Sequence, residues 1–182
     1  MREKNSKKGF FSFFKSIDKT KSRNVINKSF EDSETFLLLF DCSSQKKYNE
    51  FLSICSFFQS QNKKLYSIGF HNLPALPLYC LSDSNTIFLT KKELKKSGKI
   101  KSNEVHDLLK NNFDVLISVI NSHHKTINYI TLKANANLKI GLTSEKTSPL
   151  FDISFKAEND TPQEEILKMA INFQNTFQNK QI

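Results

Sequence analysis

The sequence predicts an α/β fold: an open, mainly parallel sheet of five to six strands with helices on both faces, Rossmann-like and three-layered, plus a basic N-terminal arm. Two observations predict it. Short apolar runs alternate with helical patterns along the chain. The strongest runs, at 35–40 and 113–120, are almost continuously apolar, which is typical of strands buried on both faces. With 182 residues and 38% hydrophobic residues, the chain can form one packed domain.

Each predicted element follows from a local pattern. The expected strands lie at 35–40, 65–70, 86–90, 113–120, 138–142 and 150–155. Apolar residues at helical spacing predict helices at 46–63, 103–112, 123–135 and from 162 to about 177. Pro74 and Pro77 predict a loop at 73–80, and the lysine-rich stretch 91–102 predicts a surface loop.

Two details concern the end of the chain. Only seven residues separate the fifth and sixth predicted strands, which is too few for a helical crossover, so we expect the last strand to be antiparallel or bent off the sheet. Thr161-Pro162-Gln163-Glu164 has the pattern of a helix start. Thr161 would cap the helix, Pro162 would take the first helical position and Glu164 would close a capping box.

Charge divides the chain into an arm, residues 1–34, a single domain, residues 35–178, and a short tail, residues 179–182. Residues 1–30 hold nine basic and two acidic side chains, a net charge of +7 out of +9 for the whole chain. The domain is therefore close to neutral. A basic arm favours an anionic partner, and the plain alternative is a solubilising tail.

Aromatic residues make the arm distinctive. Phe10, Phe13, Phe14 and Ile17 fall on one helical stripe between lysines. This composition fits an RNA-binding arm or an interfacial membrane helix, and it also fits a stripe that packs on the domain itself. The residues expected to contact a partner are Lys7, Lys8, Phe10, Phe13, Phe14, Lys15, Lys19, Lys21 and Arg23.

Several classes of protein are excluded or disfavoured. No two of the four glycines lie closer than 29 residues, which excludes the standard dinucleotide and P-loop motifs, and no G-x-S-x-G elbow occurs. No metal-binding motif is present, so we expect neither metal nor cofactor. Three cysteines without a C-x-x-C fit reduced thiols and a cytoplasmic protein. No apolar run could span a membrane, and no secretory signal is evident.

Polar residues at the strand ends are the remaining candidates for chemistry, because ligands of parallel sheets bind beyond the carboxyl ends of the strands. Asp41 could act as a general base or as the carboxylate of a phosphate site, and His71 or His123 could be its acid partner. The simpler interpretation, which we favour, is that Asp41 and Ser43-Ser44 cap the following helix and that the histidines are solvated loop residues.

The chain resembles an uncharacterised family of small α/β proteins from Bacteroidetes-type bacteria. The residues that carry the resemblance are Phe88–Leu94, Asn103-Glu-Val105, Phe113–Ile117, Tyr129-Ile130 and Ala134–Gly141, together with Phe40-Asp41. The resemblance covers most of 35–178 and implies no activity. A weaker likeness is to the N-terminal half of heptosyltransferase-type glycosyltransferases. The nucleotide-sugar-binding domain of those enzymes is lacking, so the likeness implies a shared fold only.

The expected function is therefore that of a non-catalytic cytoplasmic binding protein. Its arm would contact an anionic partner, with RNA or a ribonucleoprotein ahead of the inner-membrane surface. The alternative is a small or degenerate Rossmann-like enzyme that holds a nucleotide or sugar nucleotide at the carboxyl rim of the sheet.

Overall fold

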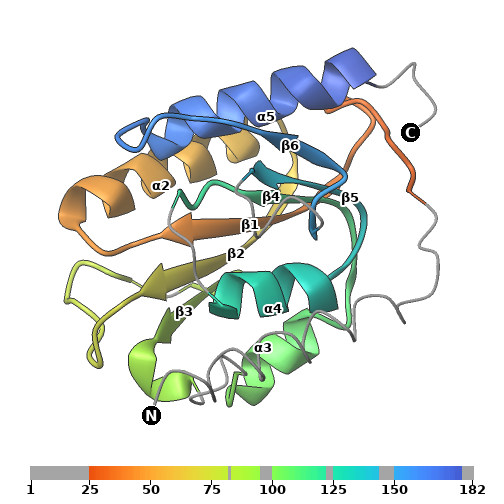
Figure 1. Cartoon of the computed structure of the whole chain (residues 1–182). Coiled ribbons are helices and arrows are strands. Elements are labelled where there is room, and N and C mark those ends of the chain that lie inside the picture. The colour runs from red at the N-terminus through yellow and green to blue at the C-terminus, as the bar shows by residue number, and fades with distance from the viewer. Residues whose placement is uncertain (1–24, 82, 95–99, 122–124, 144–149, 178–182) are drawn as a thin grey trace, which may run out of the picture.

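A single parallel sheet organises the chain (Figure 1). The computed structural model describes residues 25–81, 83–94, 100–121, 125–143 and 150–177. The strands are β1 (Thr35–Asp41), β2 (Lys64–His71), β3 (Thr86–Thr90), β4 (Asn112–Ser118), β5 (Asn135–Leu142) and β6 (Ile153–Phe155). They follow the order β3-β2-β1-β4-β5-β6, and each neighbouring pair is parallel. The predicted open, mainly parallel sheet is confirmed.

Helices cover both faces of the sheet, as Figure 1 shows. The helices α2 (Gln45–Ser60) and α5 (Gln163–Phe177) lie side by side on one face. The other face carries α3 (Asn103–Leu108) and α4 (Lys125–Lys133), and the short 3-10 helix η1 (Lys91–Glu93) follows β3. Side chains of β1 alternate between the two layers: Phe36 and Phe40 pack toward α2 and α5, whereas Leu37 and Leu39 pack toward α3 and α4. Burial on both faces explains the continuous apolar run.

The expected direction of the last strand was wrong, because β6 runs parallel to β5. The strand begins at Ile153 rather than 150, so ten residues separate it from Leu142. Asp152 binds the chain to β5 just before β6 starts. Its N–H donates to the carbonyl of Lys139 at 2.8 Å, and its carboxylate accepts from the N–H of Lys139 at 2.7 Å. This pairing brings the chain back alongside β5 just before β6, so that β6 can run parallel to β5.

Several element boundaries also differ from the prediction, among them those of α5 and β5. The carbonyl of Pro162 accepts hydrogen bonds from the N–H groups of Glu165 and Ile166, so α5 begins one residue later than expected, with Pro162 rather than Thr161 before it. The first helical N–H, that of Gln163, donates to the Glu50 carboxylate of α2 at 3.0 Å. A side chain from another element thus caps this helix. The strand β5 also starts three residues earlier than predicted, with a single residue between it and α4.

Residues 25–34, which the charge pattern assigned to the arm, pack on the domain. Phe30 is 3% exposed, and its ring centroid lies 5.3 Å from that of Phe36 and 5.9 Å from that of Phe58. The N–H of Ile26 donates to the carbonyl of Asn137 in β5 at 3.3 Å. This segment therefore contributes an aromatic side chain to the core between the sheet and α2.

Asp114 of β4 fastens the same segment to the sheet. Its carboxylate accepts from the N–H groups of Glu34 and Thr35 at 2.9 and 3.1 Å and forms an ion pair with Lys28 at 2.9 Å. Burial opposes the charge, but the hydrogen bonds from Lys28, Glu34 and Thr35 outweigh it and lower the pKa of Asp114 to about 2. The carboxylate is thus better stabilised in the folded chain than in the unfolded chain.

This difference predicts a loss of stability in acid. Because the folded pKa is depressed, the contribution of Asp114 is complete above about pH 4, the unfolded pKa, and disappears as the pH falls toward 2. With allowance for water around the half-exposed Lys28, we expect about 1–2 kcal/mol. Urea unfolding at pH 6 and near pH 3 should show a steeper loss for the native chain than for Asp114→Asn. Equal losses would contradict this assignment.

Candidate functional site

A cavity of about 450 Å³ opens at the carboxyl ends of β1 and β4. The chain leaves β1 through α2 on one face of the sheet and leaves β4 through α4 on the other, so the strand order reverses between these two strands. Such a reversal leaves a crevice in which α/β proteins bind ligands. The cavity is lined by Asp41, Ser44, Lys46, Lys47, Glu50, Val119, Asn121, Asn159, Asp160, Thr161, Pro162, Gln163 and Ile166.

Gln163 ties together the elements that form the cavity. Its side chain is buried, and its Oε1 accepts from the N–H of Asp41 at 2.7 Å. Its Nε2 donates to the carbonyls of Asp41 and Lys47 at 3.2 and 3.0 Å. The end of β1, the first turn of α2 and the start of α5 are therefore held in one hydrogen-bonded network.

Asp41 has a local role at this site. Its carboxylate accepts from the N–H of Ser43 at 2.8 Å and forms an ion pair with Lys47. The Oγ of Ser44 accepts from the N–H of Lys47, so Ser44 is the capping residue of α2, as expected, whereas Ser43 is not. The interactions of Asp41 shape the turn between β1 and α2 and keep its carboxylate at the cavity wall.

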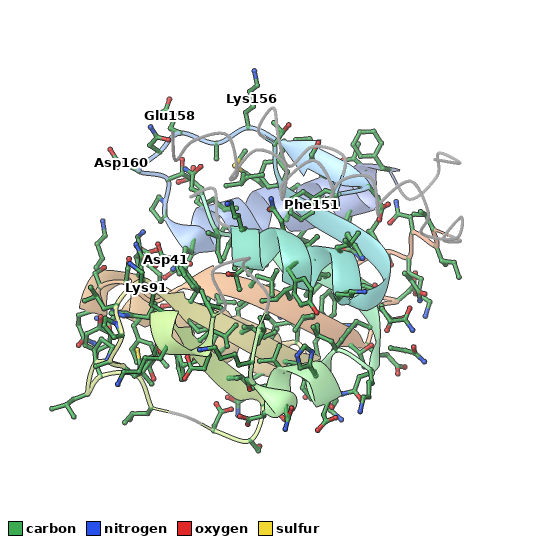
Figure 2. All side chains as sticks on the ribbon, turned by 60° about the horizontal axis from the view of Figure 1, so that its bottom comes forward. Asp41, Lys91, Phe151, Lys156, Glu158 and Asp160 are labelled. Carbon is green, nitrogen blue, oxygen red and sulfur yellow. The ribbon has the colours of Figure 1, made fainter. Side chains whose placement is uncertain are left out.

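The rim of the cavity is polar and its base is apolar. Asn121 donates from Nδ2 to the carbonyl of Glu158 at 2.6 Å, which joins the end of β4 to the loop before α5. Figure 2 shows Asp160 of this loop at the same end of the molecule as Asp41. Lys46 is exposed at the start of α2, while Val119 and Ile166 are buried beneath. A cation, carboxylates and amides over an apolar base can bind a ligand that has both anionic and hydroxyl groups.

The structure does not place His71 in this cavity. His71 is the last residue of β2, where it pairs with Thr90 of β3, and it is buried. Its Nδ1 accepts from the N–H of Leu73 at 3.3 Å. The expectation of a solvated loop residue was therefore wrong for His71, because β2 continues through it. His123 lies outside the described residues, so its pairing with Asp41 stays a prediction.

The expected partner-binding residues all lie outside the described part of the chain. These are Lys7, Lys8, Phe10, Phe13, Phe14, Lys15, Lys19, Lys21 and Arg23. Their role stays a prediction. Within 25–81, 83–94, 100–121, 125–143 and 150–177, no helix is long and apolar enough to cross a membrane, and no cluster of His, Cys, Asp and Glu could hold a metal ion.

All three cysteines are free thiols. Burial is the main factor that raises the pKa of Cys42 well above its usual value, and the neighbouring Cys80 adds to the effect. Burial and the nearby charge of Asp83 raise the pKa of Cys55 to about 12. Since the thiolate is the reactive form, these cysteines are unsuited to nucleophilic chemistry at neutral pH.

Sequence reasoning found Asp41 but missed most of its surroundings. Glu50 and Gln163 are 113 positions apart, so no local pattern could reveal their hydrogen bond. The residues of the loop before α5 were also missed. The one sequence signal that could have indicated these residues is the polarity of the segment that joins the last strand to the last helix.

Comparison with known proteins gives a family but no activity. No curated protein shows significant similarity to the chain, and no solved structure does so either. The weaker likeness to heptosyltransferase-type enzymes stays a prediction. One family model matches residues 7–171, from within the basic segment to the middle of α5, which confirms the expected membership of a family without an assigned activity. Because this match covers most of the 182 residues, the chain belongs to the family of unknown function DUF6913.

Proposed function

We propose that the chain is a binding protein whose cavity between β1 and β4 takes a nucleotide or sugar nucleotide. The observation that carries this proposal is the position of the 450 Å³ cavity at the point where the strand order reverses. Its volume is within the range of small-molecule sites. Lys46, beside the amino end of α2, would face a phosphate group, and Asn121 and Asp160 would bind hydroxyl groups.

The contacts of the carboxylates support binding rather than catalysis. Asp41 is held by Ser43 and Lys47, and Glu50 caps α5 through Gln163. A general base needs a carboxylate that can take a proton from a substrate, whereas these two stabilise the fold around the cavity. The Asp41 carboxylate would then position Lys47 at the wall of a binding site.

A titration tests this proposal. Isothermal titration of the full chain with uridine diphosphate glucose and with adenosine diphosphate should show binding of at least one of them. Lys46→Ala should weaken that binding by about tenfold, since one charge-assisted hydrogen bond is lost. The matched control is Lys133→Ala, an exposed lysine in the last turn of α4, remote from the cavity lining. No binding, or equal losses in both variants, would refute the proposal.

We also propose that the basic arm contacts an anionic partner in the cytoplasm, with RNA or a ribonucleoprotein ahead of the inner-membrane surface. The net charge of +7 over residues 1–30 supports this second function. Phenylalanines between the lysines could stack on bases.

The test of the arm should remove residues 1–24 and keep Val25 onward, because Phe30 belongs to the core. We expect the shortened chain to lose RNA binding, and the binding of the full chain to fall steeply with salt as counterions are released. Mobility shift of a single-stranded RNA measures both effects. RNA binding that is equal in the two chains would exclude the arm. Binding to acidic vesicles alone would assign the arm to the membrane instead.

A further inference from the structure

The loop between β2 and β3 exposes three leucines. Leu73, Leu78 and Leu81 are 61%, 99% and 71% exposed. No charged residue occurs from 72 to 82, although 25% of the whole chain is charged. Figure 1 shows the loop projecting beyond the carboxyl ends of β1 and β2. Three such exposed leucines in one uncharged loop indicate a surface that contacts another apolar phase.

Hydrogen bonds anchor the loop to the domain, so the leucines are exposed on a loop that has a fixed structure. The hydroxyl of Tyr79 donates to the carbonyl of Cys42 at 3.3 Å, and the N–H of Leu81 donates to the hydroxyl of Tyr48 at 3.2 Å. Cys80 is buried in the core beside α2. Tyr79 and Cys80 therefore fix the base of the loop, while the leucines on either side point outward.

Lysines accompany the leucines at this edge. The N–H of Lys91 donates to the carbonyl of Leu73 at 3.1 Å, which places Lys91 and Lys92 next to the loop, and both are exposed. Figure 2 shows Lys91 at the same end of the molecule as Asp41. The nearby Glu93 accepts from the N–H and the hydroxyl of Thr90, so that carboxylate is engaged within the fold. The end of the loop that carries Leu73 thus lies beside a pair of exposed cations.

We propose that this loop inserts its leucines into the interfacial layer of an anionic lipid bilayer, while Lys91 and Lys92 contact the lipid headgroups. Lipid tails need only aliphatic surface, and anionic headgroups attract nearby lysines. Protein interfaces instead concentrate binding energy in Trp, Tyr and Arg, and leucine is under-represented among such residues. Single-stranded nucleic acid needs aromatic platforms, and Leu73, Leu78 and Leu81 supply none. The net charge of +9 adds long-range attraction to an acidic membrane.

Vesicle co-sedimentation of the full chain tests this proposal. Phosphatidylcholine vesicles with and without phosphatidylglycerol serve as the membranes. The test variant is Leu73→Ser, Leu78→Ser and Leu81→Ser together, all at exposed positions where little packing is lost. The matched control is Ile26→Ser with Leu52→Ser, two leucine-sized residues that are 45% and 44% exposed outside the loop. Thermal unfolding checks that both variants keep the native fold.

The native chain should bind the vesicles that contain phosphatidylglycerol, and the triple variant should bind them at least about tenfold more weakly. The control should bind like the native chain. Equal binding by native chain and triple variant would overturn the proposal and leave the charge of the arm as the cause. No binding by the native chain would overturn it as well.

If the triple variant instead changed the sedimentation mass without vesicles, the loop would be a contact between copies of the chain. Binding of uridine diphosphate glucose by the triple variant reports on the cavity separately from the loop. The outcomes for the two proposals can therefore be told apart.

Discussion

Replacing Phe30 with alanine is expected to destabilise the protein by about 3–5 kcal/mol, the usual cost of deleting a buried aromatic ring. The ring is 3% exposed and packs against Phe36 and Phe58, so its removal leaves a cavity in the core next to α2. Urea unfolding followed by circular dichroism measures the change. Phe57→Ala is the matched control, because that ring stacks on Phe30 at 5.7 Å but is 37% exposed, and the expected loss is about 1–2 kcal/mol.

A small loss in Phe30→Ala, equal to that in Phe57→Ala, would mean that residues 25–34 do not belong to the folded unit. The result therefore also decides where the arm ends. A shortened chain that begins at residue 35 would lose Phe30 and the Lys28–Asp114 ion pair, and its failure to bind RNA would be uninformative.

Replacing Gly69 with alanine is expected to cost about 2–3 kcal/mol through overpacking. A Cβ at this position would lie 2.5 Å from Cζ of Phe40 and 2.9 Å from Cδ1 of Phe88. Phe40 is fully buried and stacks on Phe51 at a centroid distance of 3.7 Å, so its ring has little room to move. The close approach of β2 to these rings therefore requires glycine.

The control for this prediction is Gly141→Ala. A Cβ there would collide with the ring of Phe151, but that ring is only partly buried and lies in the connection before β6. It can swing aside at lower cost, so we expect a loss of about 1 kcal/mol. Thermal and urea unfolding of both variants give the comparison. A neutral Gly69→Ala would contradict the packing around Phe40.

The central strands could be predicted from the sequence because their signal is local. Each side chain from Phe36 to Phe40 is buried on one face or the other, which leaves a continuous apolar run. The direction of β6 could not be predicted in this way. It depends on the hydrogen bonds of Asp152 with Lys139, a pairing that no spacing rule reveals.

The candidate site was predicted only in outline. A polar strand end after Phe40 indicated Asp41, and the position of the site at the carboxyl rim followed from the fold class. The cavity itself depends on contacts between distant segments: Gln163 with the end of β1, Glu50 with the start of α5, and Asn121 with Glu158. These interactions join positions 37 to 122 residues apart, whereas hydrophobic periodicity reports only on neighbours within a few turns.

Chemical-shift mapping tests the cavity between β1 and β4 most directly. Backbone amide spectra of the isotope-labelled full chain would be recorded while uridine diphosphate glucose or adenosine diphosphate is added. The cavity proposal predicts saturable shifts that cluster at Ser44, Lys46, Asn121 and Asp160, the residues that line the opening from three separate segments. Saturable shifts confined to another surface, or none at millimolar ligand, would contradict it.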